Sequence, residues 1–229
     1  MINSKIHAVV FDLDGTLISS HANIYYAVIK TFKKFGRNVI IPEKEFYALL
    51  GHHFKDMFSA LNIEVDDIEE FIYVYKNLYF EFINHSKPYE GVEETLKELK
   101  NNNVKIALLT TKGQDQAERI IEHFNYSKYF DLVLGRRPDM EIKPSPEPYF
   151  YICEKLNISP ENSLMVGDSE LDIRCGKNAG ALTCGVSFGY RTIEQLKAEK
   201  PDYLINKISE VTNILKHSNR DKQWKNKEQ

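Results

Sequence analysis

The sequence predicts an α/β protein with a doubly wound, Rossmann-like parallel sheet and an inserted helical domain. Two observations support this prediction. Short apolar runs such as Ala8–Phe11 alternate with segments of helical periodicity, which is typical of strands covered on both faces. Between 19 and 87 the alternation stops and only helical patterns follow one another. With 229 residues, the chain is long enough for a sizeable core and such an insertion.

The elements can be assigned in order along the chain. The first predicted strand covers about 7–12, and the inserted block contains four predicted helices, at 22–35, 43–50, 54–61 and 67–84. Further strands are expected near 104–110, 131–134, 163–167 and 181–186. Parallel sheets bind ligands at the carboxyl ends of their strands, so the residues that follow these runs are the first candidates for a site.

Two carboxylates stand at alternate positions where the first strand ends, in Asp12-Leu13-Asp14-Gly15. Carboxylates this close repel each other unless a cation lies between them or one takes a proton. Gly15 permits a sharp turn that lets main-chain groups approach a ligand. A hard cation such as Mg²⁺ fits this pattern, and a solvated acidic turn is the alternative. An EF-hand calcium loop fits worse, because its glycine comes later.

The apolar strand that begins near Lys105 ends in the hydroxyls of Thr110 and Thr111. Hydroxyl and backbone N–H donors at a strand end can hold phosphate oxygens. Thr110 and Thr111 are therefore candidate phosphate-binding residues. An ordinary strand end or helix N-cap is the alternative.

Prolines surround one lysine in Ile142-Lys143-Pro144-Ser145-Pro146, just before a helix that is expected to end near Asn157. Because the prolines restrict the backbone, Lys143 is a positioned point charge in this interpretation. The alternative is an exposed lysine.

The run Ser163–Gly167 is another strand followed by acids, Asp168 and Asp172. These two are four residues apart, so they face the same way if a helix begins at Asp168. A helix cap with Asp172 on a solvated face is the alternative. Taken together, the four segments bring carboxylates, hydroxyls and a lysine to strand ends, and this combination predicts a site for a metal and a phosphoryl group.

In these four segments the chain resembles the haloacid dehalogenase superfamily, and within it the phosphoglycolate-phosphatase-like branch. The motifs are Asp12–Leu17, Leu109-Thr110, Lys143-Pro144 and Gly167-Asp168 with Asp172, in the order and spacing typical of that family. The resemblance extends over about 5–210 and is weak between 20 and 86.

The resemblance implies a role for each motif residue. Asp12 would be the nucleophile that carries an aspartyl-phosphate, and Asp14 the general acid and then base. Mg²⁺ would be held by Asp12, the backbone carbonyl of Asp14 and Asp168, with Asp172 in the second shell. Three groups would bind the phosphoryl oxygens, namely Thr110, the N–H of Thr111 and Lys143.

The resemblance also implies a domain organisation. The catalytic core would comprise 1–18 and 88–215, and a helical cap domain would comprise 19–87 and exclude water from the site. The last residues, 216–229, hold five Lys or Arg against two acids and are expected to form a basic polar tail.

An acid at position 14 favours transfer of phosphoryl groups from oxygen, so dehalogenation is not expected. The predicted activity is that of a Mg²⁺-dependent phosphatase acting on a small phosphomonoester, with phosphoglycolate as the leading suggestion. The alternatives are a sugar-phosphate mutase of the β-phosphoglucomutase type, a pyrophosphatase, a nucleotidase and a non-catalytic phosphate-binding regulator. Gly167 favours the phosphatase, because such mutases tend to carry Glu there.

The inserted block offers candidates for substrate contact. Gly51, His52 and Lys55 lie where relatives have a glycine-led substrate loop, although a surface turn is the alternative. The aromatic block 71–82 could stack a base or sugar, but at helical spacing it more often packs a core or a partner subunit.

Composition limits the partners. The formal net charge of −3 gives no bias toward nucleic acid, and the sequence contains no apolar run that could span a bilayer. A signal peptide is not expected either. Three cysteines without metal spacing argue against a disulfide framework. We therefore expect a cytoplasmic enzyme, monomer or homodimer, whose partner is a small phosphorylated metabolite.

Overall fold

A computed structural model describes residues 6–216 of the chain. The chain divides into two compact units, which are described separately. Of the described residues, 6–17 and 89–216 form the first, here called the core unit, and Ile18–Pro88 form the second, here called the helical unit. The predicted basic tail lies outside the described residues beyond Lys216.

Within the described part of the core unit, six strands form one sheet in which all neighbouring pairs are parallel. In spatial order they are β5 (Leu132–Arg136), β4 (Lys105–Gly113), β1 (Ala8–Phe11), β6 (Ser163–Gly167), β7 (Leu182–Val186) and β8 (Tyr203–Ile205). The strand order runs outward from β1 in both directions, so the predicted doubly wound parallel sheet is confirmed. The short edge strand β8 was not predicted.

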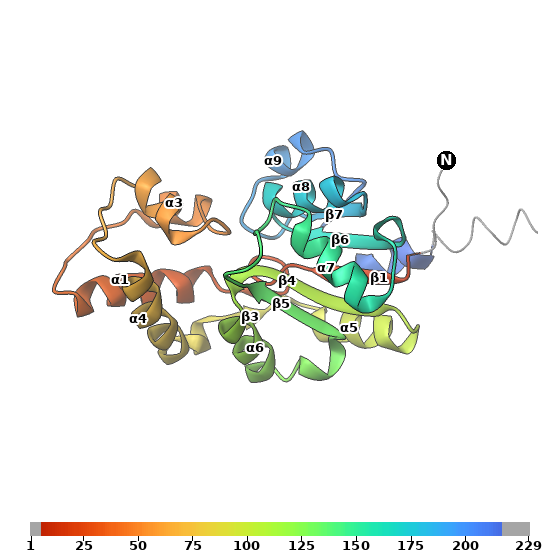
Figure 1. Ribbon diagram of the computed structural model, residues 1–229, viewed down its shortest axis with the longest axis horizontal. Helices are drawn as coiled ribbons and strands as arrows, with labels where there is room; N and C mark the ends of the chain where they lie inside the picture. Colours follow the sequence, from red (N-terminus) through yellow and green to blue (C-terminus); the bar gives the residue numbers. More distant parts are fainter. Residues whose placement is uncertain (1–5, 217–229) are drawn as a thin grey trace, which may run out of the picture. The chain divides into compact units, whose positions relative to one another are not determined.

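Helices cover both faces of this sheet (Figure 1). One face carries α5 (Val92–Asn101) and α6 (Gln114–His123), and the other carries α7 (Glu147–Leu156) and α8 (Glu170–Ala179). Helix α9 (Ile193–Ala198) leads into β8, and short 3₁₀ turns lie at Ser127–Tyr129 and Pro160–Asn162.

The strands are apolar on both sides because helices cover both faces of the sheet. All four residues of β1 are fully buried. Alternate strand side chains such as Val10 and Met165 pack with Tyr149 and Ile152 of α7 in one cluster. Their alternation directs the remaining strand residues toward the opposite face.

The sheet register brings the ends of β1 and β6 to the same level as the middle of β4. Phe11, the last residue of β1, is paired with Leu108 on one side and with Val166 on the other. The N–H of Asp12 continues this ladder by donating to the Val166 carbonyl at 2.9 Å. The residues that directly follow β1 and β6, and those near the end of β4, therefore lie together where the winding direction of the sheet reverses.

The helical unit contains α1 (His21–Lys34), α2 (Glu43–Ala48), α3 (Phe54–Ala60) and α4 (Ile68–Glu81), followed by a 3₁₀ turn at Ile83–His85. Its two ends pair as short antiparallel strands, β2 (Ile18–Ser19) and β3 (Lys87–Pro88). Its core is aromatic. Phe71 packs against Phe32 and Phe58 with ring centroids 4.7 and 5.0 Å away.

Much of the aromatic block 71–82 therefore packs the core of the helical unit. Phe71, Tyr75 and Tyr79 are buried on one face of α4, whereas Tyr73 is 70% exposed. This outcome follows the helical spacing of these residues, since every third or fourth side chain of a helix shares a face.

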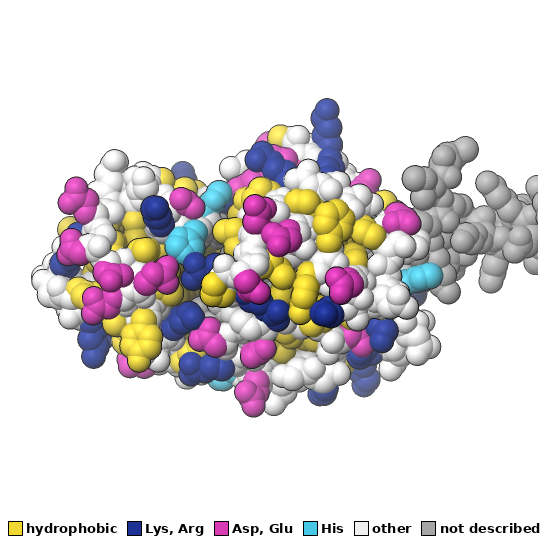
Figure 2. Space-filling model, viewed as in Figure 1, with side chains coloured by type: hydrophobic (Ala, Val, Ile, Leu, Met, Phe, Trp, Pro, Cys, Tyr) yellow, Lys and Arg dark blue, Asp and Glu magenta, His cyan; other side chains and the backbone are white. Residues whose placement is uncertain are grey.

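On the face shown in Figure 2, acidic and basic side chains are interspersed, and neither sign forms a continuous field. Among the described residues, no helix is both long and apolar enough to cross a membrane.

Candidate active site

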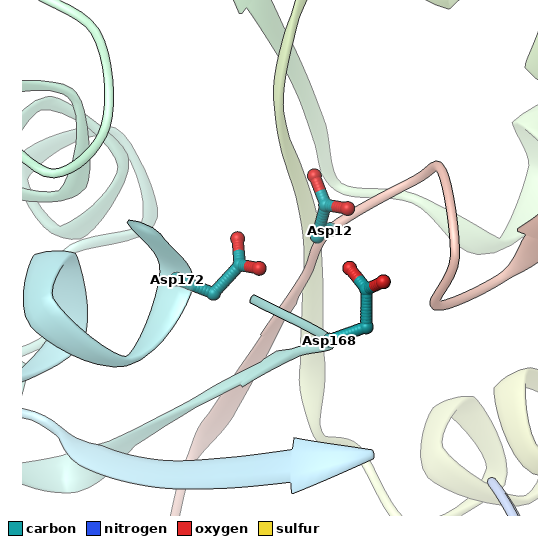
Figure 3. A group of neighbouring side chains, drawn as sticks. All are labelled: Asp12, Asp168 and Asp172. Carbon is teal, nitrogen blue, oxygen red and sulfur yellow. The ribbon is translucent and has the colours of Figure 1, made fainter. Parts of the chain in front are cut away.

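Three buried carboxylates meet at the carboxyl ends of β1 and β6. Asp12, Asp168 and Asp172 each contribute one carboxylate oxygen, and these three oxygens lie within 4.8 Å of one another (Figure 3). Asp12 follows β1, Asp168 follows β6, and Asp172 lies in the first turn of α8. The sheet therefore joins segments that are more than 150 residues apart in the sequence.

The position of Asp168 relative to helix α8 differs from the one that the sequence predicts. Helix α8 begins at Glu170, so Asp168 precedes the helix and does not share a helical face with Asp172. Instead, Asp172 turns back and accepts hydrogen bonds from the N–H and hydroxyl of Ser169, at 3.1 and 2.6 Å. This capping box fixes the carboxylate at the start of the helix.

Lys143 lies between two of these carboxylates. Its ammonium group donates to Asp12 Oδ1 at 2.6 Å, to Asp172 Oδ1 at 2.5 Å and to the Leu109 carbonyl at 3.0 Å. The residue is only 4% exposed, so it is the positioned charge that the sequence predicts and not a surface lysine. Three acceptors match the three donors of an ammonium group.

The crowding of charges shifts the pKa values at the site. Burial raises the pKa of Asp12 to about 7, although Lys143 opposes the shift. Burial, together with the charges of Asp172 and Asp12, also raises the pKa of Asp168 well above its usual value. Burial alone would lower the pKa of Lys143, but the two carboxylates outweigh it and raise that pKa.

The donor set fits a hard divalent cation. Three carboxylates share this site with one lysine, and burial together with the neighbouring carboxylates raises the pKa of Asp12 and of Asp168. A divalent cation with oxygen ligands would offset this repulsion. Asp12 and Asp168 are the residues best placed to hold it, because both oxygens of Asp172 accept hydrogen bonds from Lys143 and Ser169.

Three glycines make the close packing around the carboxylates possible. Gly15 has a φ of +84°, and a Cβ there would lie 2.2 Å from Asp168 Oδ2. A Cβ on Gly189 would lie 2.2 Å from the Asp168 Cβ and 2.6 Å from the Gly15 carbonyl oxygen. At Gly167 a Cβ would meet the Cβ of Asp172 at 2.2 Å. At these three glycines the main chain therefore packs directly against Asp168 and Asp172, where a side chain would not fit.

The loop after β7 contributes a contact that the sequence reasoning missed. The N–H of Tyr190 donates to Asp168 Oδ2 at 2.6 Å. The next residue, Arg191, is buried and forms a two-point ion pair with Glu170, with distances of 2.7 and 3.1 Å. The glycine at 189 was the available signal, since a tight approach of backbone to a ligand or a side chain requires such a residue.

The end of β4 presents Thr110 and Thr111. Thr110 is buried and its hydroxyl accepts from the N–H of Lys112 at 3.3 Å, while Thr111 is half-buried. β4 continues to Gly113, which is beyond the predicted end of the strand. The ammonium group of Lys112 lies 3.0 Å from Asp14 Oδ2, and this ion pair was not predicted. Asp14 is not a member of the three-carboxylate group.

The candidates from the inserted block belong to the helical unit. Gly51 and His52 lie in the turn between α2 and α3, where Gly51 has a φ of +98°. Lys55 is an exposed residue in the first turn of α3, and the neighbouring His53 caps that helix by accepting from the N–H of Lys55 at 3.2 Å. Their proposed contact with substrate stays a prediction.

Comparison with known proteins identifies the class. A family model described as haloacid dehalogenase-like hydrolase matches residues 9–186. Pyrophosphatase PpaX of Bacillus mycoides is 35% identical over 218 residues, which are 94% of this chain and 99% of that protein. Phosphoglycolate phosphatase of Aquifex aeolicus is 33% identical over 218 residues, which are 92% and 97% of the two chains.

A solved structure agrees with these relatives. A predicted phosphoglycolate phosphatase from Haemophilus somnus matches with a TM-score of 0.78 and 26% identity, covering 93% of this chain and 99% of that one. The chain belongs to the haloacid dehalogenase-like hydrolase family. Within that family it is an enzyme of the phosphatase branch, so the predicted resemblance is confirmed.

Proposed function

We propose that this phosphatase is Mg²⁺-dependent and hydrolyses a small phosphomonoester through an aspartyl-phosphate on Asp12. The single observation that carries the proposal is the position of Asp12. It follows β1 directly at the switch point of the sheet, it is held by Lys143, and two further carboxylates lie beside it. A buried carboxylate in contact with a fixed cation is suited to nucleophilic attack.

In the first step, a carboxylate oxygen of Asp12 attacks phosphorus, and the bond between phosphorus and the leaving oxygen breaks. The proton that the leaving oxygen needs comes from Asp14. In the second step, Asp14 takes a proton from water, the water oxygen attacks phosphorus, and the Asp12 carboxylate is restored as inorganic phosphate leaves. One difficult displacement is thereby divided into two easier ones.

Lys143 has a double role in this proposal. It orients the nucleophile through Asp12 Oδ1, and its positive charge offsets the charge that develops on the phosphoryl oxygens. Its three donors already contact Asp12, Asp172 and the Leu109 carbonyl, so a direct bond to phosphate requires the exchange of one of these contacts. Thr110 and the N–H of Thr111 are the proposed additional phosphate donors at the neighbouring strand end.

Asp12 and Asp168 would hold Mg²⁺ together with the backbone carbonyl of Asp14, and Asp172 would act through Lys143 or a water molecule. When bound, Mg²⁺ would neutralise the carboxylates and polarise a phosphate oxygen. The N–H of Tyr190 orients Asp168 for that role.

Phosphoglycolate is the first substrate to test and pyrophosphate the second, because relatives bear the names phosphoglycolate phosphatase and pyrophosphatase. A mutase is less well supported. A side chain at position 167 would collide with the Cβ of Asp172, so the Glu that such mutases tend to carry there does not fit beside this Asp172.

We further propose that the helical unit is the cap that selects the substrate, with Gly51, His52 and Lys55 as candidate contacts. A cytoplasmic location is proposed as well, and it is supported by the three buried cysteines, Cys153, Cys175 and Cys184, all of which are free thiols.

Phosphate release from a panel of compounds tests the proposal. The panel contains phosphoglycolate, pyrophosphate, a nucleoside monophosphate and hexose phosphates, each with Mg²⁺ and with a chelator. We expect one small phosphate compound to be hydrolysed fastest, only with the cation, and Asp12→Asn to lose at least about 10³-fold in rate. Wild-type protein that interconverts hexose phosphates without releasing phosphate would favour the mutase, and Asp12→Asn with wild-type activity would refute the proposal.

A further inference from the structure

The ion pair between Lys112 and Asp14 has no role in the reaction proposed above. The Lys112 ammonium group lies 3.0 Å from Asp14 Oδ2, and the two side chains are only 9% and 13% exposed. An exposed pair of this kind contributes little, but removal from water strengthens the interaction and reduces the freedom of both groups. The pair therefore restrains the carboxylate that the proposed reaction uses as acid and base.

The backbone that carries Lys112 is fixed by the neighbouring strand. Gly113 pairs with Arg136 of β5 after a shift in register. A Cβ on Gly135 would lie 2.8 Å from the Lys112 carbonyl oxygen, so the two strand ends approach closely only because residue 135 is a glycine. The side chain of Gln114 strengthens this junction by accepting from the N–H of Gly135 at 2.8 Å and donating to the Val133 carbonyl at 2.9 Å.

Asp14, in contrast, lies between β1 and the turn that begins at Gly15. It follows β1 and stands next to Gly15, whose φ of +84° marks the bend of the backbone. The ion pair with Lys112 connects its carboxylate to the end of β4.

We propose that Lys112 is a positioning residue that holds Asp14 where it exchanges protons with the leaving oxygen and with water. The proposal rests on the proposed function, because it assigns a task to the general acid and base of that reaction. Lys112 does not itself touch the reacting atoms. A general acid must be within hydrogen-bond reach of the atom that it protonates, and a misplacement of about 1 Å can cost about 10²-fold in rate.

The test uses the dependence of the rate on the leaving group. Ethyl phosphate has a basic, uncharged leaving oxygen, phosphoglycolate has a basic leaving group with a negative charge, and 4-nitrophenyl phosphate has a leaving group that departs with little protonation. The full chain is compared with Lys112→Met, Lys112→Gln and Lys112→Arg through kcat/KM, which reports on the first chemical step. Two neutral variants guard against a fold defect in one of them, and melting temperatures are recorded for all.

We expect Lys112→Met and Lys112→Gln to lose about 10²-fold in kcat/KM on both alkyl esters and less than about threefold on the aryl ester. Lys112→Arg keeps a cation and should recover part of the loss. The matched control is Lys105→Met, which removes a lysine from the other end of the same strand, where it pairs with Asp131 at 3.3 Å and is 52% exposed. That control should change kcat/KM less than about twofold.

Three results would overturn the proposal. An equal loss on all three esters would indicate a structural role, a loss confined to phosphoglycolate would make Lys112 a substrate contact, and no loss would show that Asp14 is positioned without it. If the wild-type chain releases phosphate from none of the esters, the proposed function fails and this proposal fails with it. An active wild type with unaffected variants contradicts this proposal alone.

Discussion

The carboxyl edge of the sheet in the core unit and the centre of the helical unit bury opposite kinds of side chain. At the carboxyl edge of the sheet the buried groups are charged: Asp12, Lys143, Asp168 and Asp172 are all less than 8% exposed. In the helical unit the largest buried side chains are aromatic, with Phe32, Phe58 and Phe71 in mutual contact. One region is held at its centre by ionic hydrogen bonds, and the other by apolar packing.

This difference indicates which of the two regions is suited to catalysis. A buried charge costs several kcal/mol in desolvation unless it is paired, so a cluster of such charges is an expensive way to stabilise a fold and is typical of a functional site. Buried aromatic residues stabilise a unit directly. Substitutions at the carboxyl edge of the core unit should therefore change metal binding and catalysis, whereas those in the aromatic core should change stability.

Removal of the Lys143 charge should have the largest effect. In Lys143→Met, Asp12 and Asp172 lose their buried cation, and we expect a loss of about 3–5 kcal/mol in unfolding free energy and of at least about 10²-fold in kcat. Urea unfolding and phosphate release measure the two quantities. Lys128→Met removes an exposed lysine that pairs with Glu93 at 3.7 Å, and it should change stability by less than about 0.5 kcal/mol.

Truncation of a side chain in the aromatic core should lower the stability of the protein and leave its Mg²⁺ affinity unchanged. Phe71→Ala should lower the unfolding free energy by about 3–5 kcal/mol, because it leaves a cavity among Phe32 and Phe58. The affinity for Mg²⁺, measured by calorimetry well below the melting temperature, should stay within about twofold. Tyr73→Ala, on the exposed face of the same helix, is the control and should cost less than about 0.5 kcal/mol. A large loss of Mg²⁺ affinity in Phe71→Ala would contradict the division between the two regions.

A single methyl group tests how tightly the backbone encloses Asp168. In Gly189→Ala the new Cβ would lie 2.2 Å from the Asp168 Cβ and 2.6 Å from the Gly15 carbonyl oxygen, so the carboxylate must move. We expect Mg²⁺ affinity to fall about 10–100-fold. Gly36→Ala in the helical unit is the comparison: it introduces a side chain at a φ of +71°, but nothing lies within 4 Å of the new atom. It should cost about 1 kcal/mol in stability and leave Mg²⁺ affinity unchanged. Equal Mg²⁺ affinities in the two variants would refute this role of Gly189.

The affinity for Mg²⁺ should also depend on pH. Because burial raises the pKa of Asp12 to about 7 in the metal-free protein, the cation must displace a proton below that pH. Affinity should therefore rise about tenfold per pH unit as the pH increases toward 7. Asp168, whose pKa is also raised, makes the dependence steeper. Calorimetry in buffers with different ionisation enthalpies would detect the released protons, and an affinity independent of pH between about 5 and 7 would contradict the shift.

The sequence predicted the parts of the site that follow from strand periodicity. Asp12, Thr110 and Asp168 come near the ends of apolar runs, and a parallel sheet places such ends together. The prolines around Lys143 also indicated that it is a positioned charge, although they did not indicate that it is buried. Its partner Asp12 lies 131 residues away, a contact that only the family resemblance could suggest.

The parts that were missed depend on tertiary structure. β4 runs on to Gly113 because Gly135 lets β5 approach closely, and this extension brings Lys112 to Asp14. The contact of Tyr190 with Asp168 arises where the loop after β7 returns to the site. β8 has only three residues, which is too short for a periodic pattern to show.

The most direct test of the central claim is to look for the phosphoryl group on Asp12. The wild-type chain is mixed with Mg²⁺ and its best substrate, quenched in acid within one turnover, and digested for mass spectrometry. We expect the peptide that contains Asp12 to gain one phosphoryl group, and the corresponding peptide of Asp12→Asn to gain none. Rapid phosphate release with no phosphorylated Asp12 at any quench time, or the group on another residue, would contradict the proposed mechanism.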